Sequence, residues 1–170
     1  LDSTDVVTMS GSLPKGLAKD TYKQVISMAN KKGVKCFLDT SGEALLQGVE
    51  AKPYFIKPNS DEISYITGKS TNTLEELSKA IKELLSKGIS VVTVSLGGEG
   101  SLTGYKDKLY KAIVPKVDAV NPVGSGDSFT AGMAVAISQG MDIEEAIAFA
   151  SACGTANALE DKTGFVNKQR

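Results

Sequence analysis

The sequence predicts an α/β fold in which a mostly parallel sheet is sandwiched by helices and ends in a small β-hairpin. Strand-sized apolar runs alternate with amphipathic segments of ~10–15 residues, which is the pattern of βα units. Glycine-containing polar turns follow most of the runs. The chain of 170 residues, 41% hydrophobic and 23% charged, is long enough for one globular domain with a proper core.

The elements follow from the spacing of apolar residues. Strands are expected where apolar runs meet turn residues, at 6–9, 34–38, 54–56 and 89–96, with a hairpin formed by 101–105 and 109–114. Helices are expected where apolar residues recur at helical spacing, along 17–32, 43–46, 61–67, 74–87, 127–139 and from 143 past 153. Three helix starts carry capping residues, namely Asn59 or Ser60, Asn72 or Thr73, and Asp142. No repeat or linker divides the chain.

Composition excludes several classes of function. Lys and Arg number 19 against 20 Asp and Glu, and this balance predicts no nucleic-acid partner. No apolar stretch approaches the roughly 20 residues that span a bilayer, so no membrane partner is expected. The chain has no histidine, which removes Ser-His-Asp and Cys-His catalysis. Cys36 and Cys153 are far apart, and they are expected to be buried, reduced thiols of a cytoplasmic protein.

The strongest chemical signal is Gly124-Ser125-Gly126-Asp127, directly before a predicted helix. The N–H groups of a first helical turn lack partners and, with the helix dipole, bind anions. An acid at such a site repels a resting phosphate, but it suits phosphoryl transfer, in which it would accept the proton of the attacking hydroxyl. A plain helix start, with an acid that complements the dipole, explains the same residues. The stretch is neither a P-loop nor a dinucleotide fingerprint.

Three further stretches follow predicted strands. Residues 95–100, Ser-Leu-Gly-Gly-Glu-Gly, suit a backbone lying against a ligand, although a tight turn uses the same glycines. In 57–62, Asn59 and Glu62 could serve Mg²⁺ through water and Lys57 could reach a phosphate, whereas a capping box would also explain Asn59 and Glu62. Residues 10–14 form a fourth stretch, for which a simple strand-to-helix loop is the alternative. We expect all four at one edge of the sheet.

Together these stretches resemble the motifs of the ribokinase-like, or PfkB, carbohydrate kinases. Residues 121–133, Asn-Pro-Val-Gly-Ser-Gly-Asp-Ser-Phe-Thr-Ala-Gly-Met, are similar to the second family signature, and the other three stretches are similar to further motifs in the expected order. The Gly-Ser-Gly-Asp and Ile-Lys-Pro-Asn variants resemble the subgroup that contains 1-phosphofructokinase and tagatose-6-phosphate kinase. The resemblance covers essentially the whole chain.

The resemblance implies ATP and Mg²⁺ and assigns roles to individual residues. Asp127 matches the catalytic base, and the anion hole matches Gly124, Ser125 and Gly126. Glu62 matches a position linked indirectly to Mg²⁺. The residues that match nucleotide-binding positions are Lys57, Asn59, Ser95, Gly97, Gly98, Gly100 and, in the last helix, Asn157.

The resemblance is to the C-terminal, nucleotide-binding and catalytic-base portion of the family, over residues 1–170 as one domain. Both ends look cut, and the N-terminal sugar-binding half with its lid is expected to be absent. The full-length parent is expected to phosphorylate a primary hydroxyl of tagatose 6-phosphate or fructose 1-phosphate and to form a homodimer. Two alternatives stay open: a nucleotide-binding fragment without kinase activity, and a PfkB kinase for a free sugar, a nucleoside or a pyridoxal-type acceptor.

Overall fold

The computed structural model describes residues 4–167 and confirms the α/β fold. Its six strands lie side by side in chain order. The strands are β1 Val6–Ser10, β2 Lys35–Asp39, β3 Phe55–Ile56, β4 Val91–Ser95, β5 Ser101–Tyr105 and β6 Lys108–Ala112. The helices are α1 Thr21–Lys31, α2 Gly42–Glu50, α3 Ser60–Thr67, α4 Leu74–Ser86, α5 Ser125–Ser138 and α6 Ile143–Ala158, with a 3₁₀ turn, η1, at Gly97–Glu99.

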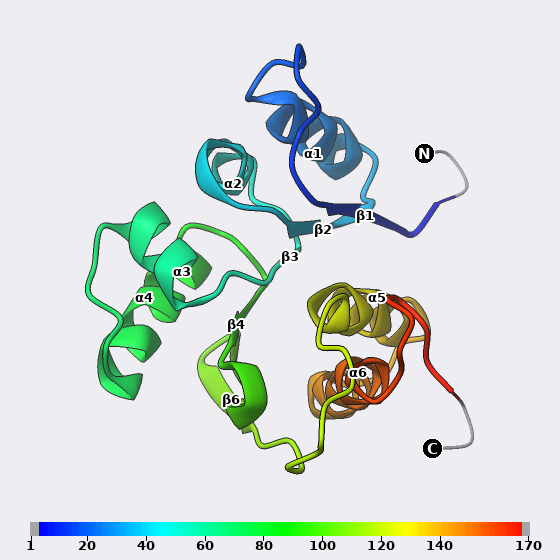
Figure 1. Cartoon of the computed structure of the whole chain (residues 1–170). Helices are drawn as coiled ribbons and strands as arrows, with labels where there is room; N and C mark the ends of the chain where they lie inside the picture. The colour runs from blue at the N-terminus through cyan, green and yellow to red at the C-terminus, as the bar shows by residue number, and fades with distance from the viewer. Residues whose placement is uncertain (1–3, 168–170) are drawn as a thin grey trace.

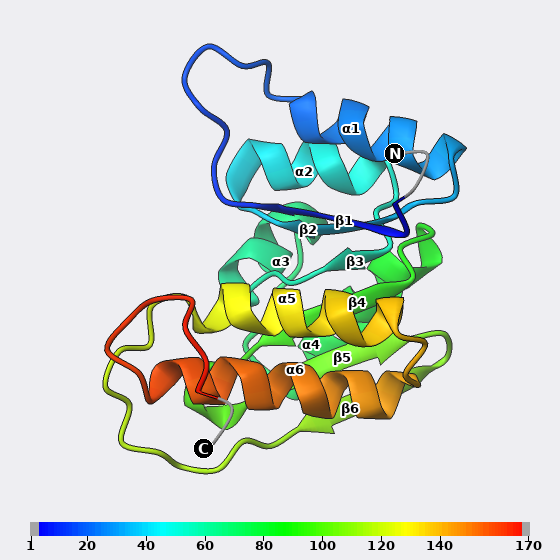
Figure 2. The same ribbon diagram turned by 90° about the vertical axis from the view of Figure 1, so that its right-hand side faces the viewer.

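The sheet is parallel from β1 to β4 and antiparallel through β4, β5 and β6. Helices α1 to α4 cover one face, and α5 and α6 cover the other, as Figures 1 and 2 show. The parallel strands therefore end at one common edge. Because ligands of open parallel sheets bind beyond that edge, the loops there are where a site is expected.

Alternating side chains in the strands build two separate cores. In β2, Cys36 and Leu38 join the core under α1–α4, while Phe37 joins the core under α5 and α6. Phe55 and Ile56 of β3 divide in the same way. This alternation is the two-residue period of a strand whose two faces are both buried. The sheet is thus covered on both sides by apolar helix faces.

Some predicted boundaries were wrong. The predicted helix at 43–46 continues to Glu50, because Gly48 brings α2 against β2: a Cβ at Gly48 would lie 2.4 Å from the Leu38 side chain. Leu17 lies before α1, which begins only at Thr21. The second hairpin strand ends at Ala112 rather than at 114, because Ala112 pairs with Ser101, the first residue of β5. Cys36 is buried as predicted, but Cys153 is partly exposed.

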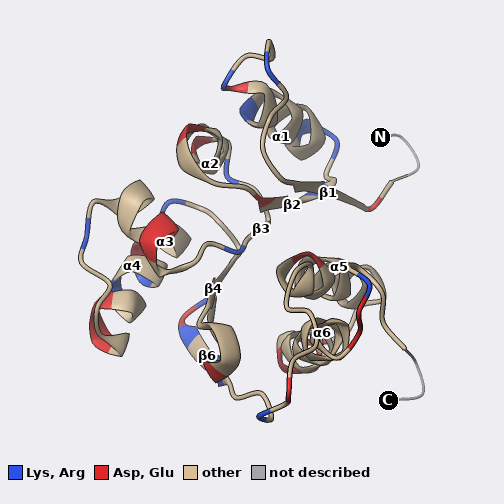
Figure 3. Ribbon diagram, in the orientation of Figure 1, with Lys and Arg blue, Asp and Glu red and all other residues tan. Residues whose placement is uncertain are grey.

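Charged residues are distributed unequally between the two faces (Figure 3). Helices α1–α4 together carry both acidic and basic residues, whereas α5 and α6 carry Asp127, Glu144 and Glu145 and no Lys or Arg. Any positive charge near the start of α5 therefore comes from another element. Within residues 4–167, no helix is both long enough and apolar enough to cross a bilayer.

Candidate active site

A small cavity lies at the carboxyl edge of the parallel strands. Its volume is about 300 Å³, and the residues that line it are Gly11, Ser12, Asp39, Thr40, Ser41, Glu62, Gly126 and Asp127. Three of the four predicted stretches thus contribute to one site, since residues 11–12, 62 and 126–127 meet here. Residues 39–41 are lining that the sequence reasoning missed. Their position at the end of β2 could have indicated that they line the site, because the other stretches that line it also follow strands.

Helix α5 begins with backbone amides that face this cavity region. Gly124 stands at the N-cap with φ of 86° and provides no capping side chain. The amide of Ser125 donates to the Pro122 carbonyl at 3.2 Å. The amides of Gly126 and Asp127 donate to no residue in the described range. They are therefore the free donors of the predicted anion hole, while the Ser125 amide is already engaged.

The Asp127 side chain is exposed and lines the cavity. Within residues 4–167, its carboxylate makes no hydrogen bond or ion pair. It lies in the first turn of α5, at the positive end of the helix dipole. A carboxylate with no partner, beside free amide donors, can accept a proton from a hydroxyl that enters the cavity.

Lys57 brings a positive charge to the start of α5. Its Nζ lies 3.1 Å from Asp39 Oδ2, and the Lys57 side chain is only 10% exposed. A Cβ built on Gly126 would lie 3.0 Å from that Nζ, so the ammonium lies directly beside the first turn of α5. Glycine at position 126 therefore leaves room for the ammonium. The predicted phosphate-facing lysine is thus next to the predicted anion hole.

Asn59 and Glu62 form a capping box at the start of α3. Asn59 Oδ1 accepts from the Glu62 amide at 2.8 Å, and Glu62 Oε2 accepts from the Asn59 amide at 2.9 Å. The capping alternative is therefore observed. It engages the single side-chain oxygen of Asn59 and one of the two carboxylate oxygens of Glu62, and Glu62 still lines the cavity. Capping fixes the direction of Glu62 and leaves its second carboxylate oxygen without a partner in the described range.

The glycine loop follows β4 and packs against the end of β6. Gly97 and Gly100 have φ of 58° and 97°, and a Cβ on Gly100 would lie 2.1 Å from the Ala112 carbonyl oxygen. Gly98 borders open space. The Ser95 amide donates to the Pro58 carbonyl at 3.2 Å, which ties this loop to the one after β3. Tight packing explains Gly100, while Gly98 leaves open space at the surface.

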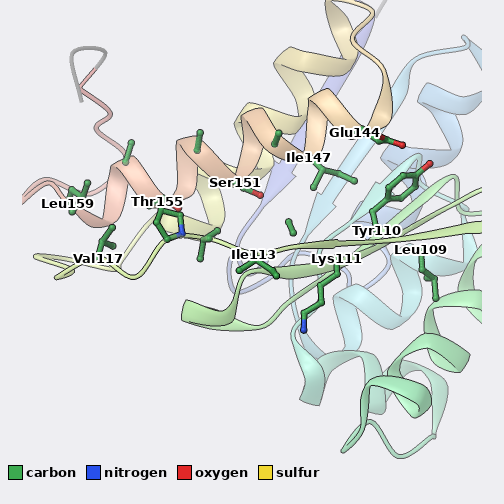
Figure 4. A pocket seen from close by; sticks show the side chains of 16 residues that line it. Leu109, Tyr110, Lys111, Ile113, Val117, Glu144, Ile147, Ser151, Thr155 and Leu159 are labelled. Carbon is green, nitrogen blue, oxygen red and sulfur yellow. The ribbon is translucent and has the colours of Figure 1, made fainter.

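A larger apolar groove of about 830 Å³ lies between α6 and the segment 109–117. Figure 4 shows Ile147, Ser151 and Thr155 of α6, with Leu159 just after it, along one side and Ile113 and Val117 along the other. Ala112, which Gly100 contacts, also lines this groove. The groove is therefore continuous with the glycine loop.

Asn157 is completely buried and does not face the groove or the cavity. Its Nδ2 donates to the Val123 carbonyl at 3.0 Å and to Ser125 Oγ at 3.3 Å. Its Oδ1 accepts from Ser128 Oγ at 3.3 Å and from the Gly164 amide at 2.7 Å. Every hydrogen-bonding atom of this amide is thus engaged within the protein, and Asn157 braces the start of α5.

The cysteines are not reactive groups of this site. Burial raises the pKa of the Cys36 thiol and that of the Cys153 thiol, so both favour the neutral form. Within residues 4–167, no three Asp, Glu, Cys or His side chains are close enough to hold a metal ion by themselves.

Three comparisons place the chain among known proteins. The model for "pfkB family carbohydrate kinase" matches residues 1–170. A curated tagatose-6-phosphate kinase of Staphylococcus epidermidis is 41% identical over 170 residues, which is 98% of this chain and 55% of the relative. The chain thus spans about half the length of the curated relatives it matches.

Solved structures share both fold and sequence. Phosphofructokinase-2 from Escherichia coli, in a complex with potassium, has a TM-score of 0.91 at 30% identity over 98% of this chain and 55% of its own. A ribokinase of Arabidopsis thaliana, complexed with ribose and ATP, has a TM-score of 0.80 at 27% identity over 94% of this chain and 51% of its own. From its motifs, its fold and these matches, the chain belongs to the pfkB family of carbohydrate kinases.

Proposed function

We propose that this chain forms the phosphoryl-transfer centre of an ATP-dependent kinase that phosphorylates a primary hydroxyl of a ketohexose phosphate. The observation that carries the proposal is the unpartnered Asp127 carboxylate beside the free amides of α5, with the Lys57 ammonium next to Gly126. These groups supply a base, anion donors and a positive charge within one site. Phosphoryl transfer needs mainly positioning and charge stabilisation, which such groups provide.

In this mechanism Asp127 accepts the proton of the acceptor hydroxyl while the hydroxyl oxygen attacks the γ-phosphorus of ATP. The bond from the γ-phosphorus to the β–γ bridging oxygen breaks, and ADP leaves. The amides of Gly126 and Asp127 stabilise the negative charge on the migrating group, and Lys57 adds its positive charge. The acid that would repel a resting phosphate is thereby used in the reacting state.

The nucleotide would lie across the two hollows. The apolar groove between α6 and residues 109–117 suits the flat adenine ring, and the glycine loop at Gly97, Gly98 and Gly100 lies between the groove and the sheet edge. Ser95 and Asn59 lie in two adjoining loops, where they pair with each other in a single parallel β-bridge. Asn157 acts indirectly in this proposal, through the brace at the start of α5.

Mg²⁺ fits this site as an ion held largely by phosphate and water. Glu62 offers a free carboxylate oxygen at the cavity, and the absence of a three-ligand cluster within the described residues suits an ion that keeps several waters. When bound, Mg²⁺ would neutralise charge on the phosphates. The residue that would orient it is Glu62, whose direction the capping box fixes.

The acceptor class rests on the relatives. A tagatose-6-phosphate kinase at 41% identity and phosphofructokinase-2 at 30% identity both have names that indicate phosphorylated hexoses. Tagatose 6-phosphate and fructose 1-phosphate are therefore the first acceptors to test. A panel that adds free sugars, a nucleoside and a pyridoxal-type alcohol separates the alternative acceptors. ATP binding without transfer to any of them would favour the nucleotide-binding alternative.

The decisive experiment compares two acids that both lie at helix starts. Asp127→Asn removes the proposed base, whereas Asp142→Asn is the matched control, because Asp142 caps α6 through the Glu145 amide and asparagine caps equally well. In the full-length protein, we expect Asp127→Asn to lower kcat by about 10²–10⁴-fold without weakening ATP binding. Asp142→Asn should change neither. Near-normal turnover in Asp127→Asn would reject the base.

A further inference from the structure

Asp39 joins three elements of the site, although it belongs to none of the four motif stretches. It is the last residue of β2. Its Oδ2 lies 3.1 Å from the Nζ of Lys57, which follows β3, and it accepts a hydrogen bond of 3.0 Å from Thr130 Oγ1 of α5. Thr130 is one turn beyond Asp127 on the same helix. Asp39 therefore links the phosphate-facing lysine to the helix that carries the proposed base.

These groups are well shielded from solvent. The side chains of Lys57 and Asp39 are 10% and 17% exposed, and Thr130 is 1% exposed. A partly desolvated pair held by a further hydrogen bond keeps its geometry better than an exposed pair does. Nothing on α5 or α6 could replace the ammonium, because those helices carry no Lys or Arg. The place of Lys57 Nζ beside Gly126 thus depends on Asp39.

We propose that Asp39, supported by Thr130, is a positioning residue that holds the Lys57 ammonium beside Gly126, in the path of the migrating phosphoryl group. This inference rests on the proposed function. The negative charge of Asp39 lies at the same cavity and opposes the binding of resting phosphates. Asp39 therefore contributes to the geometry of transfer and not to the affinity for ATP, since an interaction that improves only the reacting state raises kcat.

This reasoning separates Asp39 from Lys57 in a kinetic experiment on the full-length protein. Asp39→Asn removes the negative charge and frees the lysine. We expect kcat to fall by about 10- to 100-fold, as for a misplaced group, while the dissociation constant of ATP stays the same or decreases. Lys57→Met removes the positive charge itself, so it should lower kcat and weaken ATP binding together.

A second pair of variants keeps every charge, so it tests the proposal even if the Asp39→Asn variant does not fold. Thr130→Val removes the hydrogen bond to Asp39, and Thr130→Ser retains the hydroxyl. We expect a smaller fall in kcat in the valine variant, with unchanged ATP affinity, and recovery in the serine variant. Equal kcat values for the two variants would overturn the role of Thr130 and with it the supported pair.

A structural readout makes the result independent of turnover. Acetylation of Lys57 by acetic anhydride, followed by peptide mass spectrometry, should be slow in the parent and faster in Asp39→Asn. An unchanged acetylation rate would overturn the positioning role, even if the proposed function fails because no acceptor is phosphorylated. Loss of transfer in Asp127→Asn with normal kcat in Asp39→Asn would overturn this inference and leave the proposed function intact. A raised Mg²⁺ requirement in Asp39→Asn, with Lys57 still protected, would make Asp39 a metal-site residue and also overturn it.

Discussion

The start of α5 differs from the starts of α3, α4 and α6, which carry capping side chains. Asn59, Thr73 and Asp142 each accept a hydrogen bond from a first-turn amide of their own helix. At α5 the N-cap is Gly124, which has no side chain to do so. These three helix starts satisfy a first-turn donor with a side chain. Helix α5, like α1 and α2, has no side-chain cap, and it keeps two amides free at the cavity.

The difference shows how the first turn of a helix can keep amide donors free for an anion, where a capping side chain would bind them. A capping side chain at position 124 would occupy the donors that an anion needs, and its Cβ would lie 2.6 Å from Thr163 Cγ2. The free amides cost little local stability, because a glycine N-cap is less stable than a capping side chain by only about a few tenths of a kcal/mol. The four experiments below test this comparison.

The largest effect is expected from Gly124→Ala. The left-handed backbone at φ of 86° costs a side chain about 1–2 kcal/mol, and the Cβ also meets the Gly164 amide nitrogen at 3.1 Å. Thermal unfolding should show this loss, and phosphoryl transfer should fall steeply because the start of α5 shifts. Gly140→Ala is the control, with φ of 77° and no neighbour within 4 Å, and should show the backbone effect only. Equal unfolding temperatures would contradict the close packing at Gly124.

Gly126→Ala should separate stability from activity. Alanine favours a helix over glycine by up to about 1 kcal/mol, so the melting temperature should hold or rise. The new Cβ would lie 3.0 Å from Lys57 Nζ and displace it, so kcat should fall. In a Lys57→Met background the same substitution should have little further effect, which a double-mutant cycle measures. Independent effects would place the ammonium away from Gly126.

The two capping boxes provide a matched comparison. Asn59→Ala and Thr73→Ala each remove one cap and should each lower the free energy of unfolding by about 1 kcal/mol. Transfer activity should fall only in Asn59→Ala, because that box directs Glu62 at the cavity. Denaturant unfolding and steady-state kinetics measure both quantities. A similar loss of activity in Thr73→Ala would mean that capping acts on the fold and not on the site.

The smallest effect concerns pH. The Ser70 hydroxyl, with the amides of Thr73 and Asn72, donates hydrogen bonds that lower the pKa of Glu76 below its ordinary value of 4.5. The folded state therefore prefers the ionised acid, so the stabilisation is complete above pH 4.5 and is lost as the pH falls through the lower folded value. The difference in melting temperature between the parent and Glu76→Gln should shrink over that interval. A difference that grows on acidification would reverse the sign.

The sequence predicted the order of the elements and their common edge because both follow from local patterns. The alternation of apolar residues and the caps Asn59, Thr73 and Asp142 were visible in the chain, and the structure has them. Boundaries were less accurate. The helix after β2 was expected to end at residue 46, whereas Gly48 allows close packing that continues it, and this depends on Leu38 from β2.

Within the site, motif residues were easier to find than the residues that support them. Asp39 and Thr130 are 91 positions apart, and nothing in the spacing of either indicates their hydrogen bond. The engagement of the Ser125 amide by Pro122 likewise depends on the turn before α5. Asn157 was predicted near the nucleotide, but its four contacts depend on how α6 meets residues 123–128 and 164.

Through Asn157, the segment after α6 affects the start of α5, although that segment does not line the cavity. The Gly164 amide donates to the same side chain that holds Val123 and Ser125, so a proteolytic cut between α6 and Gly164 would untether the amide-bearing turn from 40 residues away in sequence. A nicked molecule would keep its sheet and both cores. Its turnover would fall before its circular dichroism spectrum changed, so a kinetic assay would detect a cut in this segment more sensitively than spectroscopy.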